Sequence, residues 1–254
     1  AIVTGSTSGI GLGIARALAA GGADVLLNGF GKTDEIARLQ DELERLHGVT
    51  VLYSAADMSR PDQIHAMMAD ATARLGWVDI LVNNAGIQHV APLDTFPPEK
   101  WDAVLAINLS AAFHAMQAVI PGMKARGWGR IVNVASAHGL VASPFKSAYV
   151  AAKHGVVGLT RSLALEYARR GVTVNAVCPG YTDTPLVADA TANIVAKTGR
   201  SEQEARAALA KVNPMQRLVT PEEVADAILW LASEGASSIN GQAVAVAGGE
   251  VFTG

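Results

Sequence analysis

The sequence predicts an α/β protein with a doubly wound parallel sheet of seven strands, and three observations lead to that prediction. Short β-branched runs alternate with longer segments of helical periodicity, as repeated strand–helix units do. Runs such as 80–83 and 131–135 are apolar at consecutive positions, which is typical of strands covered by helices on both faces. Half of the 254 residues are hydrophobic and only 17% are charged, so we expect one large core in a single domain, 1–254.

The strand-like runs are separated by segments long enough for the crossover helices that parallel strands require. In chain order they lie at 1–4, 23–28, 49–54, 78–83, 129–136, 172–177 and 242–247. One interval is different, because 183–214 contains a helical pattern at 201–212 and precedes a further helical unit at 220–233. We interpret 183–214 as a two-helix excursion near the strand ends that either forms a substrate lid or contacts another subunit.

Composition and charge exclude several classes of partner. The net charge is −3 and the basic residues are scattered, so no nucleic-acid partner is predicted. The single cysteine, Cys178, permits no internal disulfide and favours a cytoplasmic location. The apolar stretch 103–120 is interrupted by Asn108 and His114 and ends at Pro121, which favours a buried helix over a membrane span. No metal ligands are predicted.

A glycine-rich turn follows the first strand directly. Gly5, Gly9 and Gly11 lie in "TGSTSGIG", which opens a helical pattern at 10–20. Glycines there allow a tight turn and bring backbone N–H groups and a helix N-terminus close to a pyrophosphate. The alternative is a turn with a structural role only. The strand before it, the helix after it and a second half-sheet favour a dinucleotide site.

Tyr149 and Lys153 are four positions apart in "SAYVAAKHG" and therefore lie on one face of a helix. Alone, such a pair indicates a solvated phenol and ammonium. Hydride transfer to or from a nicotinamide also needs a proton to be exchanged at the substrate oxygen, and the cofactor has no group for it. A phenol with an ordinary pKa of about 10 could serve if a neighbouring ammonium and an oxidised nicotinamide favoured its phenolate.

The chain resembles the classical short-chain dehydrogenase/reductase family over almost its whole length. The resemblance rests on the GxxxGxG spacing, "NNAG" at 83–86, Asn108 in "AINL", Ser136 in "IVNVAS", "YVAAK" at 149–153, and "PG" at 179–180. It implies a Rossmann fold, a nicotinamide cofactor and a homotetramer. The long helical segments 99–124 and 148–169 would pair between the subunits of that tetramer.

The resemblance also implies roles for four catalytic residues. Tyr149 would exchange the proton, and Lys153 would lower the pKa of Tyr149 and bind the nicotinamide ribose. Ser136 would hydrogen-bond the substrate oxygen. Asn108 would hold a water molecule that connects Lys153 to solvent. The residues alone leave two alternatives open, because Ser136 could end a strand and Asn108 could interrupt a helix for structural reasons.

The end of the second predicted strand, Asn28 to Gly31, carries neither the Asp or Glu that usually holds a ribose hydroxyl nor the Arg that usually holds a 2′-phosphate. Lys32 is the nearest cation, and we therefore favour NAD over NADP. Asp57 would contact the adenine by resemblance, although it could equally be a carboxylate at a helix N-terminus. The residues assigned to the cofactor are Gly5, Thr7, Ser8, Gly9, Ile10, Gly11, Phe30, Asp57, Met58, Asn84, Ala85, Gly86, Tyr149, Lys153, Pro179, Gly180, Thr182 and Thr184.

Polar residues outside these motifs indicate the substrate. Gln88, His138 and Lys146 lie close in sequence to the cofactor and catalytic motifs, and together with Ser136 and Tyr149 they form the predicted substrate site. One cation and two neutral donors suit a small carboxylate. A surface lysine and a structural imidazole remain the alternatives.

These stretches resemble the bacterial D-3-hydroxybutyrate dehydrogenases within the family, which use NAD. That subgroup has a further Gln where this chain has Ala190, and the tail 247–254 also departs from its usual ending. The predicted activity is the interconversion of (R)-3-hydroxybutyrate and acetoacetate, or of a close 3-hydroxy or 3-oxo acid. The alternatives are a reductase of 3-oxoacyl or cyclic ketone substrates and a non-catalytic dinucleotide-sensing protein.

Overall fold

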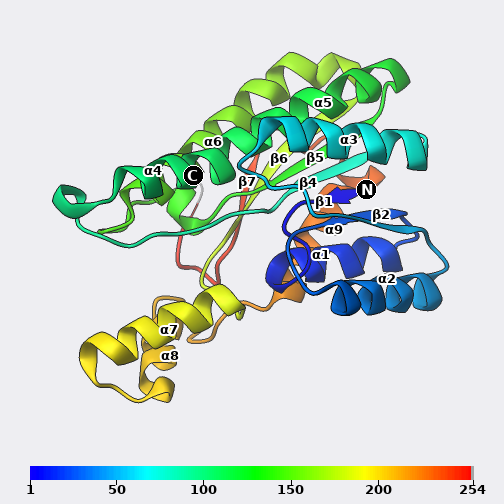
Figure 1. The fold of residues 1–254 in the computed structure, drawn as a ribbon. Coiled ribbons are helices and arrows are strands. Elements are labelled where there is room, and N and C mark those ends of the chain that lie inside the picture. The colour runs from blue at the N-terminus through cyan, green and yellow to red at the C-terminus, as the bar shows by residue number, and fades with distance from the viewer. Residues whose placement is uncertain (253–254) are drawn as a thin grey trace.

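The computed structural model describes residues 1–252 and contains one parallel sheet in the order β3-β2-β1-β4-β5-β6-β7 (Figure 1). The strands are β1 Ile2–Val3, β2 Val25–Asn28, β3 Val51–Ser54, β4 Ile80–Asn83, β5 Gly129–Val134, β6 Val172–Pro179 and β7 Ala243–Val246. The strand order reverses between β1 and β4, the switch point at which ligands bind in doubly wound sheets. The predicted fold class is confirmed; the last two residues of the predicted domain, 253–254, lie outside the described residues.

Helices cover both faces of the sheet, as the uninterrupted apolar strands required (Figure 1). On one face lie α3 Pro61–Leu75, α5 Ala111–Arg126 and α6 Ser147–Tyr167; on the other lie α1 Gly9–Ala20, α2 Thr33–His47 and α9 Pro221–Leu231. Short 3-10 turns occur at Leu93–Thr95, Ala137–Gly139, Ala168–Arg170 and Glu234–Ala236. The two helical layers leave only the strand ends open.

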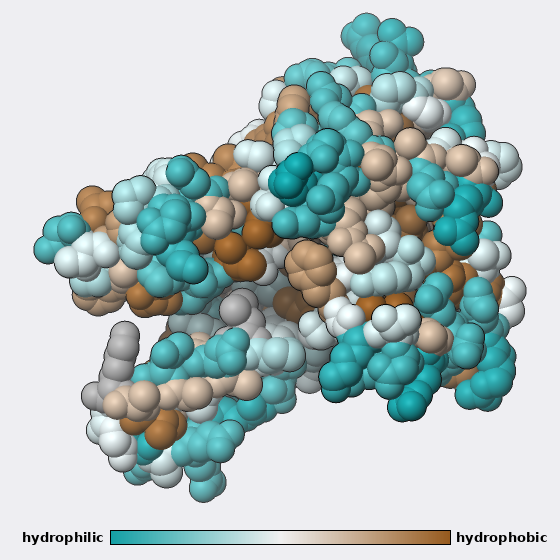
Figure 2. Space-filling view, in the orientation of Figure 1, coloured by the Kyte–Doolittle hydropathy of each residue, from teal (hydrophilic) through white to brown (hydrophobic). Residues whose placement is uncertain are grey.

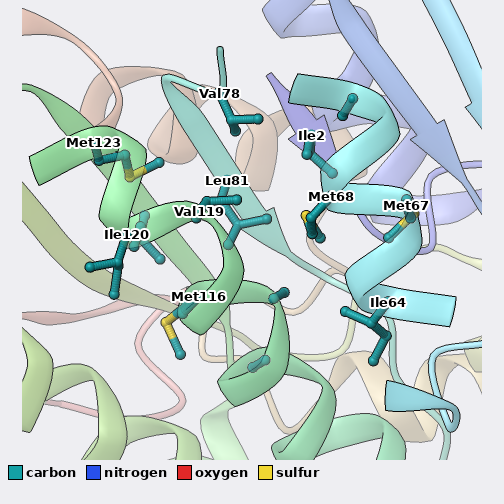
Figure 3. Packing of buried hydrophobic residues seen from close by; sticks show 14 of the residues in the cluster. Ile2, Ile64, Met67, Met68, Val78, Leu81, Met116, Val119, Ile120 and Met123 are labelled. Atoms are coloured by element: carbon teal, nitrogen blue, oxygen red, sulfur yellow. The ribbon is translucent and has the colours of Figure 1, made fainter. Parts of the chain in front are cut away.

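The core on the α3 and α5 face is rich in methionine (Figure 3). Met67 and Met68 of α3 face Met116 and Met123 of α5 across Leu81 of β4. Unbranched thioether side chains fill the uneven space between helices and a twisted sheet. This packing anchors α3 and α5 to one face of the sheet, and the carboxyl ends of the strands carry the cavity.

The helical run from 98 to 126 differs in one respect from its prediction. It consists of α4 Pro98–Leu105, a π-helical turn Ala106–Ser110 and then α5, so it continues past Pro121 instead of ending there. Pro121 is exposed, and the carbonyl that loses its partner to a proline can then face water. The run is long and apolar enough to span a membrane by composition, but α5 packs its apolar face into the core.

The predicted excursion at 183–214 contains two helices, α7 Pro185–Thr198 and α8 Glu202–Ala210, which project from the body as a separate lobe (Figure 1). Helix α8 begins with a capping box between Ser201 and Glu204. A backbone bridge from Thr182 to Val219 closes the base of the lobe. The lobe therefore lies beside the carboxyl ends of β5 and β6.

Candidate active site

A cavity of about 460 Å³ lies at the carboxyl ends of the strands. It opens between the body and the α7–α8 lobe, where Figure 2 shows a hollow. All predicted cofactor and substrate residues line this cavity, as do three of the four predicted catalytic residues. Asn108 is the exception. Segments from most of the chain therefore meet at one site of the size that small ligands occupy.

The glycine-rich turn is closely packed against its own backbone. A Cβ added to Gly11 would lie 2.1 Å from the carbonyl oxygen of Gly5, so no larger residue fits there. Gly5 and Gly9 have φ values of 62° and 54°, in the left-handed region that glycine adopts without strain. The N-terminus of α1 consequently opens directly onto the cavity, with backbone N–H groups available to an anion.

Asn28, at the end of β2, holds this turn to the sheet. Its Oδ1 accepts a hydrogen bond from Gly5 N at 3.2 Å, and its Nδ2 donates to the carbonyl oxygens of Ser54 and Ala56 at 3.1 and 2.9 Å. The side chain is fully buried. Asn28 thus joins three strand ends, a role that the sequence did not indicate.

The turn after β4 is held in a similar way. Asn84 Nδ2 donates to the carbonyl oxygens of Thr4 and Gly5, both at 2.9 Å, and the hydroxyl of Thr4 accepts from the backbone N–H groups of Asn84 and Ala85 at 3.0 Å. The polar side chains of this turn therefore have partners within the protein, which leaves the backbone of 84–86 as the surface facing the cavity.

At the far end of the cavity, Phe30 is 69% exposed and Asp57 lines the wall. Hydrogen bonds from Ser59 hold the pKa of Asp57 below its ordinary value, so Asp57 is an acceptor at neutral pH. Lys32, the nearest cation in sequence, instead pairs with Glu35 at 3.0 Å on the exposed side of α2. Within residues 1–252, no Arg or Lys lines this end of the cavity.

The predicted catalytic side chains meet at the opposite end. Ser136 follows β5, and its hydroxyl accepts from His138 N at 3.1 Å, which fixes the 3-10 turn after it. Lys153 is buried and donates to Val134 O at 2.8 Å. Its Nζ lies 5.7 Å from the centroid of the Tyr149 ring. The i, i+4 spacing on α6 therefore places the phenol and the amine together beside the end of β5, as predicted.

The structure does not show the lowered pKa that was predicted for Tyr149. Burial raises the pKa of Tyr149 above its ordinary value, and a hydrogen bond with Ser136 only partly opposes that effect. Burial also lowers the pKa of Lys153 to about 8, because desolvation disfavours its charged form. The prediction also counted the charge of an oxidised nicotinamide, so it stays a prediction for the cofactor-bound protein; in the protein alone, desolvation of both groups opposes it. An acidic phenol here requires a further positive charge.

Asn108 lies in the π-helical turn and not on the cavity wall. Its amide is used by the main chain of Ile87, whose N–H donates to Oδ1 and whose carbonyl accepts from Nδ2, both at 2.8 Å. Beside Asn108 and Lys153 is a separate space of about 10 Å³, close to the minimum for one water molecule. The structure thus gives Asn108 a positioning role for the 84–87 turn, and the water relay stays a prediction.

The predicted substrate residues surround the outer part of this end. Lys146 is buried and donates to the hydroxyl of Tyr181 at 3.2 Å. The His138 ring lies edge-on to those of Tyr149 and Tyr181, and burial next to the Lys146 charge lowers the pKa of His138 to about 4. His138 is therefore a neutral donor or acceptor at physiological pH. Gln88 and Ala190 also line the cavity.

Sequence reasoning missed two polar residues in this region, Tyr181 and Glu250. Tyr181 directly follows the Pro179–Gly180 motif, and that proximity was a signal that could have identified it. Glu250 comes from the tail after β7, which was noted only as unusual. Cys178 is buried beside the site, and burial raises the pKa of its thiol to about 11, so it remains protonated. In the described part of the chain, no three His, Cys, Asp or Glu side chains converge on a metal site.

The chain matches the model of the short chain dehydrogenase family over residues 1–213, and it belongs to that family. It is therefore an oxidoreductase. The family agrees with the fold that the sequence predicted.

Two curated relatives and one solved structure are similar to this chain over nearly its whole length. A D-beta-hydroxybutyrate dehydrogenase of Rhizobium meliloti is 52% identical over 98% of this chain and 97% of its own length. An enzyme of the same name from Cupriavidus necator is also 52% identical, over 95% of this chain and 93% of its own length. Among solved structures, a variant of actinorhodin polyketide ketoreductase with NADPH is 39% identical and superimposes with a TM-score of 0.92, covering 98% of this chain and 95% of that one.

Proposed function

We propose that this protein is an NAD-dependent dehydrogenase that interconverts (R)-3-hydroxybutyrate and acetoacetate, or a close 3-hydroxy acid. The observation that carries the proposal is a buried cation, Lys146, within the same cavity as the Tyr149–Lys153 pair. A cation desolvated next to neutral donors suits a small carboxylate whose hydroxyl carbon faces the reacting groups. The names of the two 52% identical relatives support the same substrate.

A nicotinamide cofactor, when bound, supplies hydride transfer to and from carbon. The residues present fit such a group, because the glycine turn would clash with any added side chain and aims backbone donors at the cavity. Within the described residues, no Arg or Lys lines the cavity at its Phe30 end, since Lys32 pairs with Glu35, and this supports NAD over NADP. The similar ketoreductase structure contains NADPH, so the choice of NAD rests on the residues of this chain and not on the fold.

Within the protein, Tyr149 would exchange the proton at the substrate oxygen. Ser136 lies on the same side, and its hydroxyl would hydrogen-bond that oxygen as charge changes there. Burial disfavours the phenolate of Tyr149. The positive charge of an oxidised nicotinamide would offset that cost, and Lys153 would add to it in its protonated form. Proton exchange by Tyr149 is thus tied to the oxidised cofactor.

The experiment that tests the proposal is a panel of hydroxy and oxo acids assayed with NAD and with NADP in parallel, followed by the absorbance of the reduced cofactor. (R)-3-hydroxybutyrate should react with NAD at a higher kcat/KM than with NADP. Cofactor binding without turnover of any alcohol would overturn the proposal and indicate a dinucleotide-sensing protein instead.

A second candidate is a reductase of 3-oxoacyl or cyclic ketone substrates. The observation that favours it is Ala190, whose methyl group lines the cavity where the hydroxybutyrate subgroup was expected to place an amide. The same panel separates the two, because a neutral ketone would then react better than acetoacetate. A homotetramer and a cytoplasmic location stay predictions, and sedimentation of the purified protein would test the first.

A further inference from the structure

Glu250 places an unexpected carboxyl group at the substrate end of the cavity. It follows β7 in the tail, where its backbone N–H donates to Ala247 O at 3.1 Å, so a turn of the main chain holds it. Its Oε2 packs against Gly180, since a Cβ added to Gly180 would lie 2.7 Å from that oxygen. An acidic side chain is thus built into the wall of a pocket that was predicted to bind an acid.

This carboxyl group has little compensation from the protein. Its Oε2 is shielded from solvent and accepts no hydrogen bond from residues 1–252. Lys146 is near enough for its charge to lower the pKa of Glu250, yet burial raises that pKa by more. Among the described residues, Glu250 Oε2 has no partner, and Lys146 donates to Tyr181 instead. Lys146 and Glu250 therefore line the same pocket without forming an ion pair.

A carboxylate removed from water is costly unless donors surround it. A ligand that brings an O–H or N–H group to Glu250 would recover part of that cost, whereas a purely apolar group would bury the carboxylate further. The lobe contributes Ala190 to the same cavity, and its methyl group can offer no hydrogen bond to a ligand. Glu250 therefore adds an acceptor from the tail to the wall of the pocket.

On the basis of the proposed function, we infer that Glu250 is a specificity-determining residue that accepts a hydrogen bond from a hydroxyl or ammonium group of the substrate. The preferred substrate is then a 3-hydroxy acid with a second donor group: Lys146 holds its carboxylate and Glu250 holds the donor. Plain 3-hydroxybutyrate lacks that donor and is the poorer substrate.

The test compares three acids that differ only at the carbon next to the alcohol: 3-hydroxybutyrate, 3,4-dihydroxybutyrate and 4-amino-3-hydroxybutyrate. The kcat/KM of each is measured at saturating NAD for the wild type, Glu250→Gln and Glu250→Leu. Asp41→Asn is the matched control, because it removes a carboxylate from the exposed side of α2, away from the cavity. Thermal melting checks that each variant folds.

The wild type should prefer an acid with a second donor by about tenfold, as expected for a hydrogen bond to a charged group. In Glu250→Gln, the kcat/KM preference for the amino acid should fall more than the preference for the dihydroxy acid, because the neutral amide no longer pairs with the ammonium charge. This difference distinguishes the two donors. Glu250→Leu should lose both preferences and favour 3-hydroxybutyrate. Asp41→Asn should leave all three ratios unchanged.

A wild type that favours 3-hydroxybutyrate over both other acids, or ratios that survive in Glu250→Leu, would overturn the role of Glu250 while leaving the proposed function intact. If none of the three acids is turned over, the proposed function is overturned. In that case, calorimetric titration of the same acids into the NAD complex of the wild type and Glu250→Leu decides the role of Glu250. Equal affinities in the two proteins would then reject it.

Discussion

The two ends of the cavity differ in how their polar groups are satisfied. At the dinucleotide end, Asn28 and Asn84 use their amides to bind neighbouring main chain, so the glycine turn is held before any ligand arrives. At the substrate end, Lys146 has one hydroxyl partner and Glu250 has an oxygen with none among the described residues. A preorganised region suits the cofactor, because the same ligand always binds there. Unsatisfied polar groups at the substrate end favour those substrates that can form hydrogen bonds with them.

The strongest test of this division is Tyr149→Phe, which removes the proton carrier from the substrate end alone. Turnover should fall by about 10³-fold, in the range expected for loss of general acid–base catalysis. The affinity for NAD, measured by calorimetry, should change little, because the glycine turn and the 84–86 backbone remain. Retained activity would assign the proton transfer to another group.

Gly11→Ala tests the dinucleotide end. The new methyl group would lie 2.1 Å from Gly5 O and 2.5 Å from Asn84 Nδ2, so the turn must shift at a cost of about 1–3 kcal/mol in the free energy of unfolding. Urea unfolding should show this loss, and NAD should bind more weakly.

Gly235→Ala is the matched control, because an added Cβ at this exposed position meets only Ser233 Oγ, at an ordinary contact distance of 3.5 Å. It should change the free energy of unfolding by no more than about 0.5 kcal/mol and leave NAD affinity unchanged. Equal losses in both variants would mean that the glycine turn is not closely constrained.

Lys146→Ala should raise the KM for acetoacetate by about 10- to 100-fold, because a charge-assisted hydrogen bond to the carboxylate is lost. The KM for the methyl ester of acetoacetate, which has no charge, should rise much less. Lys32→Ala provides the control, since Lys32 is exposed and pairs with Glu35 outside the cavity. A similar rise for the acid and the ester would contradict a carboxylate at Lys146.

His138 gives the smallest effect, on the pH dependence of stability. Its pKa is about 4 in the folded protein and ordinarily 6.5. Between these values the unfolded chain binds more protons, so this contribution to stability is complete above pH 6.5 and is lost as pH falls through 4. The ring is only partly buried, so we expect about 1 kcal/mol after allowance for solvent screening.

The measurement is urea unfolding of the wild type and His138→Asn at pH 7 and pH 4.5. The free energy of unfolding of the variant should fall less between these pH values than that of the wild type. An identical fall in both proteins would mean that His138 titrates normally and is not held neutral by its surroundings.

The sequence by itself determined the architecture and the reacting groups. Apolar strand runs predicted the parallel sheet because both faces had to be covered, and all seven strands lie within or overlap the predicted runs. The spacing of Tyr149 and Lys153 predicted their shared helix face because helical geometry is local. The glycines of the first turn were recognisable because only glycine tolerates that backbone.

Only the tertiary structure decided the environments of these groups. Burial, which no spacing reveals, raises the pKa of Tyr149 instead of lowering it. The amide of Asn108 faces Ile87, and Pro121 is accommodated on a solvent-facing side of α5. Glu250 lines the same cavity as Lys146 although more than one hundred residues separate them in the sequence. Such contacts depend on long-range packing and desolvation, which arise only when distant segments are brought to one cavity.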